Sequence, residues 1–418
     1  MLYMKRLKPL TPILLAVLAT LPGICLRFFH LEFSPPLMVM FSGTSILCAS
    51  FILLWASDLA QADISQALAL AVVALIVILP EYAVDMYFTW QAGQNPAGGY
   101  AHYAIANMTG ANRLLIGVAW PVIASLWWLR TRQTVQLEAE RKTELLFLGI
   151  ATLYAFLIPV KGTLVWYDGL ILLAIYGWYM KLVSKRPCVE CDFTGPVEHL
   201  SRLPTIQRRF ITLMLFLFSA GAILSQAEIF SEGLVATGRL FGINEFLLVQ
   251  WLAPLASEAP EFTVAIMLTL RGHAGVALGS LLSAKLNQWT LLVGMIPGVY
   301  GISTSTLASP IPMDSLQMHE ILLTAAQSLF AVILLMQMSL SMTGAIILFS
   351  LFAIQFIGPA IVNFLPIATR WNLNGDTVHI ALSFIYIGFA LILILAKPSR
   401  FTNLRSSTST CKTVRPQS

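Results

Sequence analysis

Two short stretches of similar sequence, Pro80-Glu81-Tyr82-Ala83-Val84 and Pro260-Glu261-Phe262-Thr263-Val264, decide the fold of this chain. Each lies within a long apolar run, and each is followed by a short polar turn and another apolar run that is rich in small residues. The match continues there, because residues 104–112 correspond to residues 277–285. The two halves of the chain are therefore copies of one another.

The register of the two copies changes further along. Residues 114–117 match residues 291–294, but four residues earlier than the preceding match requires. Four residues are about one helical turn. The sequence thus predicts that the first copy lacks one turn of this helix.

The composition is that of a membrane protein. Of the 418 residues, 57% are hydrophobic and 11% are charged, whereas about a quarter of an ordinary globular protein is charged. The net charge of +5 does not indicate a nucleic-acid partner, because the basic residues sit in short clusters between apolar runs. The expected partners are inorganic cations and the lipid bilayer, and the sequence does not indicate an oligomeric state.

A spanning helix takes about 20 residues, so the apolar runs predict twelve spanning helices. These runs cover residues 10–28, 36–60, 64–91, 100–129, 144–160, 164–183, 210–238, 244–270, 275–303, 317–338, 342–365 and 376–396. Five helices separate each residue of the first Pro-Glu pair from its counterpart in the second. Because five is odd, the second copy must be inverted in the membrane relative to the first.

This count divides the chain into six parts. The first is an uncleaved N-terminal membrane helix, and the two inverted repeats are separated by a cytoplasmic loop. We place the parts at residues 1–30 (N-terminal helix), 36–183 (first repeat), 184–209 (loop), 210–365 (second repeat), 376–396 (extra C-terminal helix) and 397–418 (cytoplasmic tail).

The basic residues predict the orientation. With both termini in the cytoplasm, only Arg27, Lys161, Arg239 and Arg370 of the 25 lysines and arginines fall in outer loops. Positive residues accumulate on the cytoplasmic side of membrane proteins. We therefore expect an integral protein of the plasma (inner) membrane, with the 184–209 loop in the cytoplasm.

The paired Pro-Glu helices, each followed by a Gly/Ser/Asn-rich segment, resemble the two α-repeats of the cation/Ca²⁺ exchanger superfamily, which includes the sodium/calcium exchangers. Its first motif runs roughly Gly-Thr-Ser-x-Pro-Glu and its second Gly-Asn-x-x-Gly-Ser-Asn. The resemblance covers about residues 36–365. It implies an all-α polytopic membrane protein of two inverted five-helix repeats, with one extra helix at each end.

The resemblance also implies site residues. Glu81 and Glu261 match the glutamates that bind Ca²⁺ at the centre of such exchangers, and Asn107, Asn112 and Ser280 occupy motif positions. It implies a secondary active cation antiporter that exchanges Ca²⁺ or another cation for H⁺ or Na⁺. It implies neither an enzyme nor a cofactor, since the ions are the cargo.

The chain departs from the motifs at three places. Val77-Ile78 stands in the first repeat where the family has Thr-Ser, and Ser257-Glu258 stands in the second. Oxygen ligands are therefore lost on one side, and a carboxylate is gained on the other. Lys285 occupies the last Asn position of the second motif. We expect its ammonium to act as a tethered cation that neutralises Glu258 or Glu261.

Charged residues in the apolar runs need a reason to be there, because each costs about 2.5–3.5 kcal/mol at a helix centre on insertion scales. Asp85 lies four residues after Glu81, and Glu258 lies three before Glu261, so each pair shares a helix face. Hard divalent ions prefer such oxygen clusters. The expected cation ligands are Glu81, Glu258, Glu261, Asp85, Asn107, Asn112, Ser257 and Ser280, with Lys285 and Arg113 as coupling or charge-pairing residues.

Prolines in these runs give the site a further expected feature. Pro80, Pro254 and Pro260 remove backbone donors. Helices interrupted near the membrane midplane expose carbonyl groups that coordinate ions in transporters. We therefore expect both Pro-Glu helices to be broken.

Two alternatives remain open at this stage. In the first, the charges only pair with one another, Arg113 with Asp85 and Lys285 with Glu258, in a degenerate family member that binds ions or scaffolds partners without transport. In the second, Asp168 and Asp376 are the catalytic pair of an intramembrane aspartyl protease. The second lacks the Gly-x-Gly-Asp motif, because residue 373 is leucine.

Overall fold

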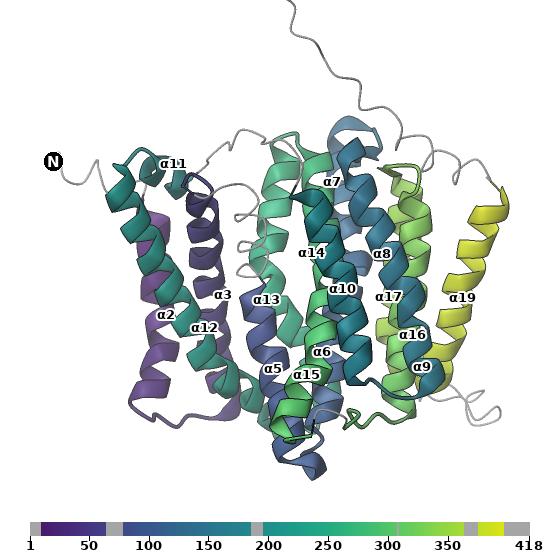
Figure 1. The fold of residues 1–418 in the computed structure, drawn as a ribbon, viewed down its shortest axis with the longest axis horizontal. Coiled ribbons are helices and arrows are strands. Elements are labelled where there is room, and N and C mark those ends of the chain that lie inside the picture. Colours follow the sequence, from purple (N-terminus) through teal and green to yellow (C-terminus); the bar gives the residue numbers. More distant parts are fainter. Residues whose placement is uncertain (1–9, 64–77, 185–194, 307–308, 363–374, 397–418) are drawn as a thin grey trace, which may run out of the picture.

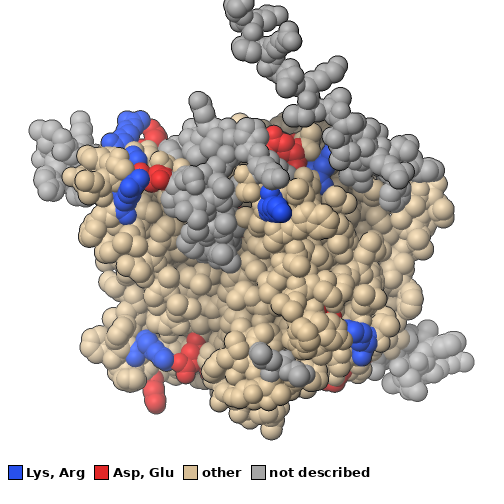
Figure 2. Space-filling view, in the orientation of Figure 1, with Lys and Arg blue, Asp and Glu red and all other residues tan. Residues whose placement is uncertain are grey.

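The computed structural model describes residues 10–63, 78–184, 195–306, 309–362 and 375–396. Within these ranges, seven helices are long and apolar enough to cross a membrane. Figure 2 shows the Lys, Arg, Asp and Glu side chains gathered at two opposite rims, with a broad belt of other residues between them. This belt is the surface expected of a protein that spans a bilayer.

The helices run roughly antiparallel across one layer of constant thickness (Figure 1). The first half contains α2 (Thr11–Phe28), α3 (Pro35–Ala60), α5 (Leu79–Gln94), η2 (Pro96–Gly98), α6 (Tyr100–Leu114), η3 (Leu115–Ala119), α7 (Trp120–Thr131), β1 (Val135–Gln136), η4 (Ala139–Arg141), α8 (Lys142–Ala155), α9 (Leu157–Lys161) and α10 (Trp166–Val183).

The second half follows the short helix α11 (Pro196–Ser201). It contains α12 (Thr205–Phe241), α13 (Glu245–Leu270), α14 (Ala274–Asn287), η5 (Gln288–Leu292), α15 (Val293–Ser303), α16 (Ser315–Leu335), β2 (Ser339–Leu340), α17 (Met342–Val362) and α19 (Gly375–Ala396). The expected helix at 144–160 is divided into α8 and α9, and much of the expected 64–91 helix lies outside the described residues.

The two halves are inverted copies. In Figure 1, α3 runs upward whereas its counterpart α12 runs downward, and the two helices pack against each other. Loops of the two halves also pair with each other. Strand β1 of the first half pairs with β2 of the second, and on the opposite face Leu164 of the first half forms an isolated β-bridge with Ile311 of the second. The predicted fold of two inverted five-helix repeats is confirmed, with α2 and α19 outside the repeats.

The predicted loss of one helical turn from the first copy is wrong. Each copy contains a five-residue π-helical segment, η3 in the first and η5 in the second. The segments begin at Leu115 and Gln288, each directly after the preceding α-helix, which has 15 residues in α6 and 14 in α14. The sequence match at residues 291–294 followed similar apolar letters and not the true register.

The predicted break in the second Pro-Glu helix is also wrong. Helix α13 continues through Pro254 and Pro260. In the first repeat, α5 begins next to Pro80, at about half the height of the bundle (Figure 1). The two Pro-Glu segments therefore differ, one at a helix start and one inside a helix.

Candidate functional site

Glu81 lies in the first turn of α5, in the middle of the protein. Pro80 occupies an early helix position, where its missing N–H is not needed. The Glu81 side chain is buried, with an exposed fraction of 3%. A carboxylate in the first turn is favoured by the partial positive charge of the helix N-terminus.

Gln288 joins Glu81 to Glu258. Its Nε2 donates to Glu81 Oε1 at 2.7 Å and to Glu258 Oε1 at 3.2 Å. The amide is at the start of the π-helical segment η5, and π-helical turns occur frequently at functional sites. One side chain thus connects the Pro-Glu segments of both repeats.

Each of these three side chains has one oxygen without a hydrogen-bond partner among the described residues. They are Glu81 Oε2, Glu258 Oε2 and Gln288 Oε1, all buried. Buried polar atoms are normally satisfied. Three unsatisfied oxygens on neighbouring side chains can accept a proton or ligate a hard cation.

Two further acids surround this group. Glu261 and Asp85 both lie within electrostatic range of Glu81. Within the described ranges, however, no three His, Cys, Asp or Glu side chains come close enough together to hold a metal ion. The expected four-carboxylate cluster is therefore not assembled here, and the two acids in direct contact with one amide are Glu81 and Glu258, not Glu81 and Glu261.

Asp85 is paired with an amide. Asn107 Nδ2 of α6 donates to Asp85 Oδ1 at 2.8 Å, and both side chains are buried. Asp85 Oδ2 and Asn107 Oδ1 lack partners among the described residues. This pair presents two more oxygens one helical turn from Glu81.

Lys285 contacts its own repeat counterpart. Its Nζ donates to Asn112 Oδ1 at 2.6 Å and lies 4.5 Å from the centre of the Trp289 ring. Both Lys285 and Asn112 are fully buried. Lys285 forms no ion pair with Glu258 or Glu261 in the described part of the chain, although Glu258 is within electrostatic range. The expected direct neutralisation is replaced by a hydrogen bond to an amide.

Arg113 pairs with an acid that the sequence did not indicate. Its guanidinium contacts the carboxylate of Glu320 in α16, and both side chains are 1% exposed. The expected pairing of Arg113 with Asp85 is wrong, because Asp85 accepts a hydrogen bond from Asn107 and Arg113 forms an ion pair with Glu320. Arg113 is a charge-pairing residue, as predicted, but with another partner.

The two serines of the expected site differ in position. Ser257 is buried on α13, where its hydroxyl donates to Ala253 O at 3.2 Å and to Pro254 O at 3.3 Å. Ser280 is exposed on α14. Ser257 therefore lies beside Glu258, whereas Ser280 is not brought to the buried group.

Asp168 has a structural role. It receives a hydrogen bond from Tyr154 at 2.6 Å, pairs with Lys161, and accepts from the backbone N–H of Val165 at the start of α10. These contacts cap a helix and tie it to α8 and α9. They leave no reason to assign Asp168 to a protease.

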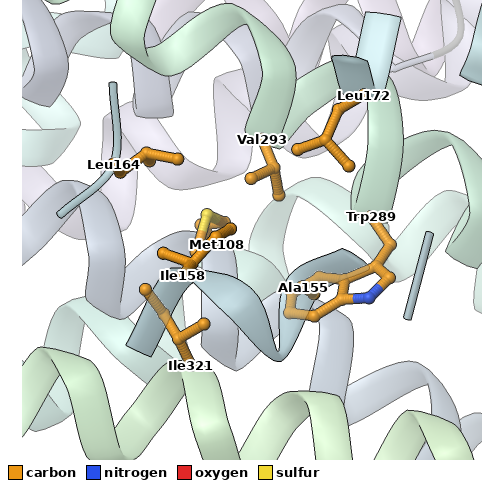
Figure 3. Close-up of a pocket in the computed structure, with 8 residues that line it drawn as sticks. All are labelled: Met108, Ala155, Ile158, Leu164, Leu172, Trp289, Val293 and Ile321. Atoms are coloured by element: carbon orange, nitrogen blue, oxygen red, sulfur yellow. The ribbon is translucent and has the colours of Figure 1, made fainter. Parts of the chain in front are cut away.

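A cavity of about 10 Å³ lies beside the site, between α6, α10, η5 and α16 (Figure 3). It is large enough for about one water molecule. Its lining is Met108, Ala155, Ile158, Leu164, Leu172, Trp289, Val293 and Ile321. Since these side chains present almost no polar atoms, the cavity is not an ion site.

Sequence reasoning missed Gln288 and Glu320. Gln288 is equivalent to Leu115 when the two repeats are aligned. Because leucine is apolar, the comparison of the repeats does not point to position 288 as a site residue. Its spacing of three residues from Lys285 was the available signal, since such residues share a helix face. For Glu320 the available signal was Arg113 itself, because buried charges are normally paired and a buried arginine therefore needs an acidic partner.

A family model described as sodium/calcium exchanger protein matches residues 33–185 and 211–358. The solved structure of an H⁺/Ca²⁺ exchanger, CAX, is 40% identical over 96% of this chain and 97% of that chain, with a TM-score of 0.88. The structure of native YfkE has the same fold, with a TM-score of 0.62 and 12% identity over 83% of this chain and 98% of that chain.

No curated protein matches the chain. The matched family segments nonetheless cover most of both halves, and the 40% identity extends over nearly the whole length. These matches exclude the protease alternative. The chain belongs to the sodium/calcium exchanger family and is a cation antiporter, not an enzyme.

Proposed function

We propose that this protein exchanges Ca²⁺ for H⁺ across the membrane. The observation that carries the proposal is the Gln288 amide, which donates to one oxygen of Glu81 and one of Glu258. The second oxygen of each carboxyl group has no partner among the described residues. Two such carboxyl groups bind either one divalent cation or protons. Binding of protons and binding of Ca²⁺ thereby exclude each other at the same oxygens, so Ca²⁺ binds when the protons are released.

The remaining ligands come from the neighbouring side chains. We propose that Asp85, Asn107 and Glu261 line the path or complete the coordination, and that Ser257 contributes a hydroxyl when α13 moves. Asn112 is occupied by Lys285 in the present arrangement, so it ligates only if that bond opens. Ser280 has the weakest support because it is exposed.

Lys285 favours H⁺ over Na⁺ as the coupling ion. Its Nζ donates to an amide oxygen that would otherwise be open to a monovalent cation. The exchanger whose solved structure is 40% identical in sequence to this chain is named for the same two ions, H⁺ and Ca²⁺. A Na⁺-driven mechanism is the alternative.

Uptake into reconstituted vesicles tests the proposal. We expect Ca²⁺ to enter against its gradient when a pH gradient is imposed, and not when a Na⁺ gradient of equal size is imposed. Na⁺-driven uptake would contradict proton coupling, and uptake under neither gradient would favour a family member that binds ions without transport.

We also propose the division and orientation inferred from the sequence: repeats at 36–183 and 210–365, extra helices near each end, and both termini in the cytoplasm of a plasma-membrane protein. The rim at the top of Figure 1, where α11 lies and α12 begins, then faces the cytoplasm. Labelling of single cysteines introduced into the 184–209 loop and at Gly242 tests this. Labelling of the loop from outside would reverse the orientation.

A further inference from the structure

A second buried charge cluster lies away from the Glu81 and Glu258 carboxyl groups. It consists of Arg113 in α6, Glu320 in α16 and His379 in α19. His379 Nδ1 lies 3.2 Å from Glu320 Oε1, and the His379 side chain is 10% exposed. Helix α19 is outside the two repeats, at the edge of the bundle in Figure 1, and packs on α16 and α17.

Nδ1 is the ring nitrogen of His379 that faces Glu320, although neither Nδ1 nor Glu320 Oε1 has a hydrogen-bond partner among the described residues. The neutral imidazole has one N–H group and the imidazolium has two. The two forms of His379 therefore differ by one proton and one unit of charge.

The cluster does not need His379 for charge balance. Arg113 and Glu320 already form a neutral pair, and an apolar residue on α19 would pack against it at lower cost. A titratable side chain at this place makes the charge of the cluster variable: zero with neutral His379 and +1 with the imidazolium. Histidine is the side chain whose charge ordinarily changes between about pH 5 and 8.

Among the residues that the structure describes, few titratable or charged groups lie around His379. From α16 they are Glu320 and His319, from α6 Arg113, and from its own helix Asp376. Helix α17 contributes none, because residues 342–362 contain no ionisable side chain. Asp376 lies one turn nearer the lower end of α19 and is partly exposed, so a proton from water on that side meets Asp376 before His379.

We propose that the cluster of Arg113, Glu320 and His379 is a proton-binding site that loosens α19 from the repeats when His379 takes up a proton. Two cations then share one buried carboxylate, and the uncompensated charge weakens the packing of α19 on α16. Arg113 is held less firmly at the same time. Its neighbour in sequence is Asn112, the hydrogen-bond partner of Lys285, so the change reaches the transport site.

That last step rests on the proposed function, whereas proton binding and the loosening of α19 do not. The primary test therefore measures α19 directly, without transport. Hydrogen exchange of the α19 amides, corrected for the intrinsic effect of pH, is followed in nanodiscs from about pH 8 to about pH 5. We expect protection in wild-type α19 to fall on acidification by up to about tenfold per pH unit, the limit for one linked proton.

The test variant is His379→Asn. The asparagine amide keeps a polar group facing Glu320 but cannot take up a proton, so α19 protection should no longer depend on pH. His199→Asn is the matched control, because the His199 side chain is exposed on α11, and this variant should behave as wild type. Unchanged pH dependence in His379→Asn, or a wild-type α19 without any, would overturn the proposal.

A measurement on the wild type alone covers failure of the variant to fold. Nitrogen NMR of histidine-labelled protein should show one buried histidine as neutral imidazole at high pH and as imidazolium at low pH. A buried histidine that stays neutral over this range would also overturn the proposal. If the wild type showed the expected pH dependence of α19 protection but no Ca²⁺ transport, only the proposed function would be contradicted.

Discussion

Gln288 holds Glu81 and Glu258 with a single amide group, and one oxygen of each carboxyl group has no partner in the part of the chain that the structure describes. An amide suits this place because it donates to both carboxyl groups without adding charge. A lysine there would form a permanent ion pair, and a leucine would leave both acids unsatisfied. The residue therefore keeps two acids close together while their charge remains free to change.

This arrangement predicts the effect of removing either charge. In Glu81→Gln and Glu258→Gln the side-chain volume is retained, but the amide cannot bind a proton and ligates a divalent cation poorly. We expect each change to lower Ca²⁺ flux in vesicles by more than about tenfold, which corresponds to only 1.4 kcal/mol of lost cation binding, and to leave the elution profile of the purified protein unchanged.

Glu245→Gln is the control, because Glu245 lies on the same helix α13 and pairs with Arg239 at the rim. It should retain wild-type flux. Wild-type flux in both site variants would show that the buried acids only hold the helices together. Glu261→Gln distinguishes the two glutamates near the middle of α13. We expect a smaller loss than from Glu258→Gln, because Gln288 donates to Glu258 and to Glu81, and among the described residues forms no hydrogen bond with Glu261.

At the scale of elements, a close helix contact fixes the position of α6. A Cβ atom on Gly110 would lie 1.8 Å from the carbonyl oxygen of Gln250 in α13. No side chain can relieve this clash, because the obstructing atom belongs to a backbone. Gly110→Ala should therefore displace α6, together with Asn107 and Asn112.

We expect Gly110→Ala to lower the unfolding temperature in detergent and to reduce flux. The clash resembles overpacking of a core, which costs about 1–3 kcal/mol. Gly177→Ala in α10 is the matched control, because nothing lies within 4 Å of its added Cβ. Equal unfolding temperatures for the two variants would contradict the tight α6–α13 contact.

A polar clamp joins the first helices of the two repeats at the upper rim. Asp63, in the turn after α3, accepts from Arg208 Nε and Nη2 of α12, both at 2.7 Å. The hydrogen bonds from Arg208 hold the pKa of the Asp63 carboxyl below its ordinary value. A lowered pKa means that the folded state binds this proton less readily than the unfolded state.

The clamp should therefore stabilise the fold above the ordinary aspartate pKa of about 3.9 and lose this effect as the pH falls through the lower folded value. Asp63→Asn should cost about 1–3 kcal/mol at neutral pH, the range for losing charge-assisted hydrogen bonds. Thermal unfolding at pH 7 and at acid pH measures both effects. A wild-type minus variant difference that persists unchanged in acid would contradict the ionic character of the clamp.

The elements that the sequence could predict are those that repeat or that follow hydropathy. Apolar run lengths located the helices, and the Pro-Glu pair located Glu81 and Glu261. Contacts between side chains of different repeats were beyond reach, because Gln288 and Glu320 have no counterpart in the other copy that draws attention to them. The continuity of α13 also could not be foreseen, since a proline inside a helix breaks it in water but is tolerated where neighbouring helices satisfy the freed carbonyl.

At the scale of the whole molecule, the inverted repeat places equivalent residues of the two copies next to each other. Asn112 and Lys285 occupy the same position in α6 and α14, and they bond to each other. An amide in one copy thus faces an ammonium in the other. The family motif has an amide where this chain has Lys285, so the pair is asymmetric here. This asymmetry determines which coupling ion we expect.

We therefore expect wild-type Ca²⁺ transport to follow the pH gradient and to be nearly independent of Na⁺. Lys285→Asn removes the fixed charge and leaves two amides facing each other, whose oxygens can ligate a monovalent cation. This variant should either gain Na⁺ dependence or lose transport, because the vacated positive charge must be supplied by an ion. Lys285→Arg, which keeps the charge, should retain proton coupling. The decisive measurement is Ca²⁺ uptake at constant pH with and without a Na⁺ gradient: strong Na⁺ coupling in the wild type, unchanged in Lys285→Asn, would show that the ammonium does not take the place of a coupling ion.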